Sequence, residues 1–174
     1  MKIASLALSL AALALPSAAI AQEARCIPRE EGRAVVATLL PDLIASAATR
    51  CGPSLERGAY LPARSAQLAA RLQPQARAAW PEAKGTFEVI LGGSLPDNPA
   101  LLEFGRKTLA EGMVQQLDTK TCSMVDRLVQ EIAPLPPENF ANVFALFLEV
   151  GLEEAQDTPF RICEASAPAR NRAR

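Results

Sequence analysis

The stretch REEGRAVVATLLPDLIASAATR, residues 29–50, carries a strong helical pattern. Its apolar side chains recur every four positions and form the centre of one broad stripe: Val36, Leu40, Ile44 and Ala48. Pro41 falls away from the centre of that stripe, so a kink there would leave the buried face intact. Gly52 and Pro53 follow and end the helix, because glycine accepts a left-handed cap and proline cannot continue the helix.

The segments that follow also have a helical character. Residues 63–79 are rich in alanine and arginine, and they predict a helix that Pro74 interrupts. Residues 81–91 are ambiguous, because Pro81 favours a helix start whereas TFEVIL has the composition of a short strand. We favour a helix, since nothing nearby offers a partner strand.

The clearest internal loop is GGSLPDNP, residues 92–99. Asp97 or Asn98 is expected to cap the next helix, and Thr119 or Thr121 the helix after it. We detect no internal repeat. The sequence therefore predicts an all-α fold, a compact bundle of about five to seven helices stapled by disulfides.

The N-terminal residues are typical of a secretory signal. Lys2 supplies a positive charge, residues 3–15 are uncharged and apolar, and Ala19-Ile20-Ala21 fits the small-x-small cleavage rule. We therefore expect residues 1–21 to be a signal peptide that is cleaved. The apolar run is shorter than the roughly 20 residues of a membrane span, so we do not expect it to stay in the membrane as an anchor. We also expect no membrane span in the chain that remains after cleavage.

The mature chain is expected to be one helical domain, residues 22–174, with a basic and frayed tail at about 166–174. The polar residues QEAR directly before Cys26 argue against a lipid anchor there. A composition rich in alanine and arginine is typical of GC-rich bacteria, which favours the periplasm or secretion. The net charge of −1 and the lack of any reader motif exclude nucleic acid as an expected partner.

The four cysteines, Cys26, Cys51, Cys122 and Cys163, predict disulfides in an exported chain. If two antiparallel helices follow Cys122, its position lies beside the end of the second helix, which favours a Cys122–Cys163 bond. Cys26–Cys51 is then left by elimination. That second pair is awkward, because the helix between them is about 33 Å long and a disulfide needs Cα atoms within about 7 Å.

The chain contains no histidine. This excludes serine–histidine triads, cysteine–histidine dyads and histidine metal sites. No two cysteines have the C-x-x-C spacing of a redox motif or zinc knuckle. We therefore expect no catalytic residues, no metal site and no cofactor.

The helix expected over residues 139–154 is apolar around nearly its whole circumference. Such a helix is either buried among its neighbours or lines a groove for an apolar ligand or a partner helix. In the second case Phe140, Phe144 and Phe147 are the candidate groove residues. Glu149, alone in the apolar run, is expected to face water or to pair with an arginine, and Asp126 to lie on a wet helix face.

These patterns favour an exported, non-catalytic α-helical module that binds or scaffolds in the bacterial cell envelope. Its partner is unknown, with an envelope protein and an apolar ligand as the two candidates. An alternative is a carrier of an apolar small molecule or lipid, held between the phenylalanine-rich helix and the first helix. A second alternative is a carboxylate-based hydrolase, which requires a cleft with two facing carboxylates.

Overall fold

The computed structural model describes residues 25–154 and 160–163, and this part of the chain forms five α-helices and two short strands. Their order is β1 (Arg25–Pro28), α1 (Arg29–Cys51), the 3-10 turn η1 (Gly52–Ser54), α2 (Tyr60–Leu91), α3 (Pro99–Val114), α4 (Thr119–Ile132), α5 (Pro137–Glu154) and β2 (Phe160–Cys163). The predicted all-α bundle of five to seven helices, stapled by a disulfide, is confirmed. The expected signal peptide and the basic tail lie outside the described residues.

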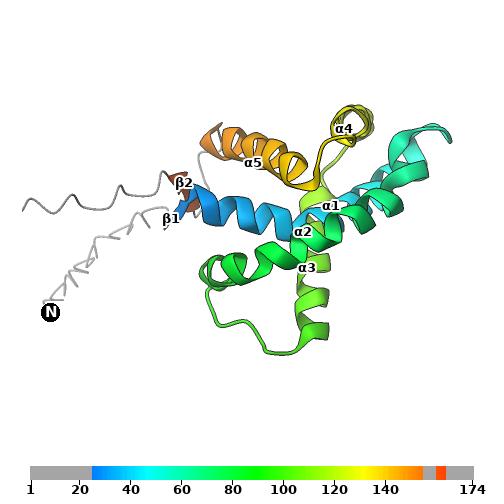
Figure 1. Cartoon of the computed structure of the whole chain (residues 1–174). Coiled ribbons are helices and arrows are strands. Elements are labelled where there is room, and N and C mark those ends of the chain that lie inside the picture. Colours follow the sequence, from blue (N-terminus) through cyan, green and yellow to red (C-terminus); the bar gives the residue numbers. More distant parts are fainter. Residues whose placement is uncertain (1–24, 155–159, 164–174) are drawn as a thin grey trace, which may run out of the picture.

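Helix α1 is the centre of the molecule, and the other four helices contact it (Figure 1). Successive residues from Val36 to Pro41 are all buried. Six successive positions cover every side of an α-helix, so the middle of α1 is buried all round rather than along one stripe. The expectation that Pro41 lies away from the buried face is therefore wrong.

Within the described residues, one segment, Arg29–Ser54, is long and apolar enough to cross a membrane. Some 67% of its apolar window is buried inside the protein, as in the core helix of a globular domain. The apolar side chains of this segment therefore pack against the four neighbouring helices.

Helix α2 runs without interruption from Tyr60 to Leu91, through Pro74 and Pro81. The predicted break at Pro74 is wrong, whereas the helix favoured over residues 81–91 is confirmed as the end of α2. A proline removes one hydrogen bond and pushes on the preceding turn, so it bends a helix that packing holds together. The last turns of α2 do point in a different direction from its first part (Figure 1).

The cap of α3 agrees with the sequence, and the cap of α4 does not. Asn98 accepts hydrogen bonds from the backbone N–H groups of Ala100 and Leu101. Helix α4 is capped by Asp118 rather than by a threonine, because its carboxylate accepts from the N–H of Thr121 at 2.7 Å. That hydrogen bond lowers the pKa of Asp118, so its contribution to stability is lost as the pH falls through the lowered pKa.

The two strands form a parallel pair that the sequence analysis did not predict. Ile27 pairs with Ile162, and the pair lies at one end of α1 (Figure 1). Each strand has four residues, and their partners are more than 130 positions apart. Segments this short carry no period-2 pattern from which a distant partner can be recognised.

The disulfide in the described core joins Cys51, at the end of α1, to Cys122, at the start of α4, with Cα atoms 5.3 Å apart. Both predicted pairings, Cys122–Cys163 and Cys26–Cys51, are therefore wrong. Cys26 is disulfide-bonded as well, and no cysteine in the described part of the chain is free.

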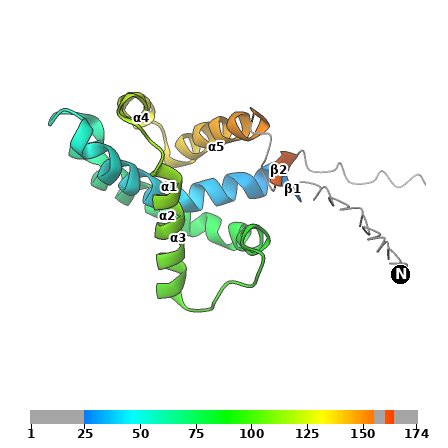
Figure 2. The same cartoon turned by 180° about the vertical axis from the view of Figure 1, so that it is seen from behind.

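The physical reason for the first error is the direction of α4. Helix α4 is seen along its axis in Figures 1 and 2, whereas α5 lies across the view. The two helices therefore do not form the antiparallel hairpin on which the Cys122–Cys163 prediction rested. Helix α4 packs chiefly on α2, which brings Cys122 to the far end of α1.

Asp126 of α4 holds the start of α2. It is 7% exposed and accepts hydrogen bonds from the backbone N–H groups of Tyr60 at 3.3 Å and Leu61 at 2.6 Å. These are among the first N–H groups of α2, and Ala59 before them has no side chain that can cap. The expectation that Asp126 lies on a wet helix face is therefore wrong.

Replacing Asp126 with alanine should lower the free energy of unfolding by about 2 kcal/mol, because it leaves the buried N–H of Leu61 without an acceptor. Asp126→Asn keeps an acceptor oxygen and should cost less. Urea denaturation measures both. Equal losses for the two variants would show that packing, rather than the hydrogen bonds, makes Asp126 important.

Candidate functional site

An apolar cavity of about 280 Å³, partly open to solvent, lies against α1. Residues of α1, α2, α3, α5 and both strands form its wall: Ile27, Arg29, Gly32, Arg33, Val35, Val36, Leu39, Leu43, Thr86, Phe87, Ile90, Leu109, Met113, Ala145, Leu148, Glu149 and Ile162. Most of these side chains are aliphatic or aromatic. A concave site of this kind is the usual form of a small-molecule pocket, and its volume is near the lower end of their range.

The floor of the cavity is the first half of α1. Val35, Val36, Leu39 and Leu43 are spaced so that they share one side of the helix. Phe87 and Ile90, from the end of α2, face them across the cavity. The bend of α2 matters here, because it directs these last turns toward the part of α1 that lies next to the strands (Figure 1).

One ion pair spans the cavity wall from α1 to α5. The Nη2 and Nε atoms of Arg29 donate to Oε1 of Glu149 at 2.6 and 2.9 Å. The Glu149 side chain is 15% exposed and that of Arg29 is 40% exposed. Of the two alternatives expected for Glu149, facing water or pairing with an arginine, the structure shows the second.

A second polar contact ties α2 to α1. Thr86 is buried in the cavity wall, and its hydroxyl donates to Oε2 of Glu31 at 2.7 Å. Arg33, also in the wall, lies 3.7 Å from Glu30 one turn earlier on the same helix. The polar side chains of the wall thus have partners within the protein.

Strand β2 closes one side of the cavity through Ile162, which packs on Gly32 of α1. A Cβ atom at Gly32 would lie 2.9 Å from Cδ1 of Ile162. Glycine at this position therefore lets the strand approach the helix closely. The sequence analysis gave Gly32 no role, because the strand it faces was not predicted.

The predicted groove residues lie elsewhere on α5. Phe140 is fully buried and its ring stacks on that of Phe144, with centroids 5.4 Å apart. Phe147 is 55% exposed. None of the three lines the cavity, to which α5 contributes Ala145, Leu148 and Glu149. The cavity borders both α1 and α5, the two helices of the predicted groove, but it lies on a different side of α5 from the three phenylalanines.

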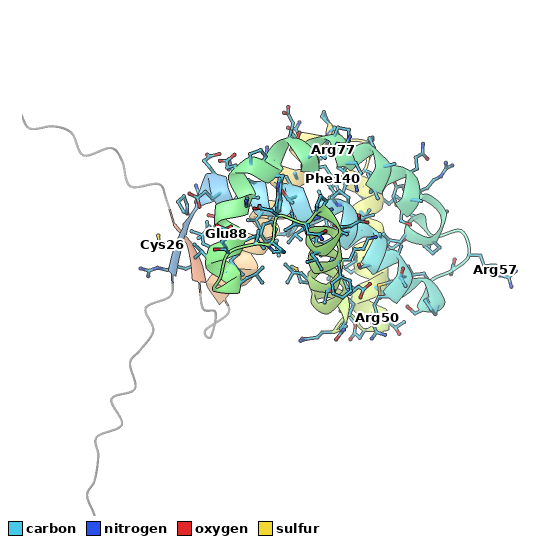
Figure 3. The ribbon with its side chains drawn as sticks, turned by 90° about the horizontal axis from the view of Figure 1, so that it is seen from below. Cys26, Arg50, Arg57, Arg77, Glu88 and Phe140 are labelled. Atoms are coloured by element: carbon cyan, nitrogen blue, oxygen red, sulfur yellow. A yellow bond between two sulfur atoms is a disulfide. The ribbon has the colours of Figure 1, made fainter. Side chains whose placement is uncertain are left out.

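Two of the cysteines that were predicted as staples are remote from the cavity. Cys51 and Cys122 are 0% and 2% exposed, and neither lines the wall. Cys26 is at the end of the molecule opposite Arg57 (Figure 3). Among the described residues, no group of three or more cysteine, aspartate or glutamate side chains is arranged to hold a metal ion.

A second cleft of about 350 Å³ lies between α1 and α3, and both Asp42 and Glu111 line it. Oδ2 of Asp42 lies 3.2 Å from Nε of Arg106, and the Asp42 side chain is only 11% exposed. Asp42 is therefore engaged in holding α3, which crosses α1 (Figure 2), against the central helix. The cleft offers no freely exposed carboxylate pair.

Comparisons of this chain with family models, with curated proteins and with solved structures found no match.

Proposed function

We propose that this protein is a non-catalytic binding protein of the bacterial cell envelope that holds an apolar small molecule in the cavity against α1. The observation that carries the proposal is the cavity of about 280 Å³ with a nearly continuous apolar wall. Apolar side chains that line a partly open cavity stay in contact with water when it holds no ligand, which is unfavourable. A bound apolar ligand would remove this surface from water.

The proposal includes export to the periplasm or to the outside of the cell. Cys51, Cys122 and Cys26 form disulfides in the structure, and disulfides persist mainly in oxidising compartments. Residues 1–21 have the pattern of a secretory signal, which supports the same location.

Binding a fluorescent apolar probe, N-phenyl-1-naphthylamine, tests the proposal in vitro. Trp80, the one tryptophan of the chain, gives a second signal, because its ring centroid is 5.8 Å from that of Phe87 in the cavity wall. We expect saturable probe binding with a matching change in Trp80 emission. Native mass spectrometry of protein purified from its host should then show a co-purifying apolar ligand. No binding and no adduct would contradict the proposal.

Replacing Ala145 with leucine should fill part of the cavity and weaken probe binding by about tenfold, the equivalent of 1.4 kcal/mol. Asn142→Leu adds a leucine on the exposed side of the same helix and should leave affinity unchanged. Titration of both variants with the probe measures the difference. Equal affinities would place the bound probe outside this cavity.

A second candidate function is the docking of an envelope protein on the outer side of α5. Leu146, Phe147 and Val150 are all more than half exposed there, and such an apolar face often marks an interface. A photocrosslinker at Phe147 should then give one specific adduct in the host cell, whereas one at the exposed Arg77 of α2 should give none. Equal labelling from both sites would reject this candidate.

A further inference from the structure

The strand pair at the cavity has an inner and an outer face. Ile27 and Ile162 are direct partners in the ladder and both line the cavity, and Ile27 is only 4% exposed. Successive residues of a strand point to opposite faces. Cys26 therefore belongs to the outer face, and it is exposed in the structure (Figure 3).

A disulfide bond joins the two strands across this outer face. Cys26 is disulfide-bonded. Cys51 and Cys122 bond to each other, so Cys163 is the cysteine of the chain that remains as its partner. The register agrees with this assignment, because position 163 follows Ile162 in β2 and so lies on the same face as Cys26.

Within the described residues, strand β2 has little besides this bond to hold it against the cavity. It is four residues long and has β1 as its one partner in the sheet. Its Ile162 packs on Gly32 of α1, and it also contacts α5. A two-stranded pair is at best marginally stable by itself. The outer disulfide therefore keeps Ile162 in the wall.

The two disulfides differ in their access to a reductant. Cys51 and Cys122 are 0% and 2% exposed, whereas Cys26 is exposed. Thiol–disulfide exchange begins with the attack of a thiolate on a sulfur, so that sulfur must be within its reach. A reductant should therefore break the outer bond first and leave the core bond between α1 and α4 intact.

We propose that Sγ of Cys26 is a site of thiol–disulfide exchange with a dithiol, and that this exchange frees β2 and opens the cavity. This inference rests on the proposed binding function and adds a means of ligand release. A thiolate of the dithiol attacks Sγ of Cys26, which breaks the bond to Cys163 and frees Cys163 as a thiolate that takes up a proton. The second thiol of the dithiol then displaces Cys26 from the mixed disulfide. The protein gains two electrons and two protons, and the dithiol becomes a disulfide.

Brief treatment of the oxidised protein with dithiothreitol, followed by alkylation and peptide mass mapping, tests the exchange. We expect Cys26 and Cys163 to be alkylated while Cys51 and Cys122 stay bonded. Amide hydrogen exchange should then become faster in β1 and β2 but stay unchanged in α4. Simultaneous alkylation of all four cysteines, or strands that stay protected after Cys26 is alkylated, would overturn the proposal.

Probe titration separates this inference from the proposed function. Reduction should weaken the binding of N-phenyl-1-naphthylamine by about tenfold, because the ligand surface that Ile162 covers returns to water. Equal affinities before and after reduction would overturn ligand release and leave the binding function standing. Oxidised protein that binds no probe would contradict the binding function and, with it, ligand release.

Variants then assign the response to the outer bond. Cys26→Ser combined with Cys163→Ser should bind the probe about tenfold more weakly than the oxidised wild type, and dithiothreitol should weaken it no further. Arg161→Ala is the matched control, because it changes an exposed residue of β2 and keeps both cysteines, so it should respond to dithiothreitol as the wild type does. A double variant that binds the probe like the oxidised wild type would overturn the role of the bond.

Discussion

Replacing Cys51 and Cys122 together with alanine should lower the free energy of unfolding by about 4 kcal/mol. The bond joins positions 71 residues apart, so it removes much conformational freedom from the unfolded chain. Both side chains are also almost fully buried, at 0% and 2% exposure. A loss of this size is a large share of the stability of a small domain.

Urea denaturation of the two single variants and the double variant measures the effect and tests the pairing. If the two cysteines bond to each other, the double variant should lose little more than either single variant. Losses that add up would show that each cysteine has another partner. A non-reducing peptide map should also show the Cys51–Cys122 peptide. Elimination among the four cysteines then assigns Cys163 to Cys26 as the expected second bond.

Replacing Phe140 with alanine should cost about 3–5 kcal/mol, because a fully buried aromatic ring leaves a cavity that its neighbours fill only in part. Phe140 has no exposed surface, and its stacking on Phe144 is lost as well. Thermal and urea denaturation give the change in stability. Binding of N-phenyl-1-naphthylamine should persist under conditions in which the variant stays folded, since Phe140 does not line the cavity.

Phe147 provides the matched control on the same helix. Its ring is 55% exposed, so Phe147→Ala should change stability by less than about 0.5 kcal/mol. If Phe147→Ala were as costly as Phe140→Ala, the described packing of α5 would be wrong. If Phe140→Ala instead abolished probe binding with little loss of stability, the result would support the groove predicted from the sequence, in which Phe140 contacts the ligand.

The helices could be predicted from the sequence because their signals are local. The pattern of residues 29–50 and the Asn98 cap depend on neighbours within one or two turns, and both agree with the structure. The break predicted at Pro74 failed for the opposite reason. Tertiary packing of α2 against α1 overrides a proline whose local effect is only a bend.

Which helix becomes the centre could not be predicted, because burial depends on the arrangement of all the helices. The sequence of the phenylalanine-rich helix is apolar around nearly its whole circumference, yet α5 leaves Leu146, Phe147 and Val150 exposed, whereas the middle of α1 is buried on every side. Small side chains explain the difference. Ala34, Ala37 and Ala47 of α1 are buried, and they let neighbouring helices approach closely on several sides.

The residues of the candidate site could not be predicted. The alternative of a carrier named α5 and α1 as the helices of a groove, and the cavity has residues of both in its wall, but not the three predicted ones. Its wall also takes residues from α2, α3 and both strands, and no local pattern connects Phe87 with Leu148 or Ile162. Asp126 was missed for a similar reason, because its partners at the start of α2 are about 65 residues earlier in the chain.

The parallel pairing of β1 with β2 makes the closure of the site depend on residues that are far apart in the chain. Ile27 and Ile162 are more than 130 positions apart, so the two strands pair only in a chain that contains both of them. Without β2, the protein has its central helix but lacks one wall of the cavity. A shortened chain that stops before residue 160 would therefore keep the bundle's sequence and lose the closure of its binding site.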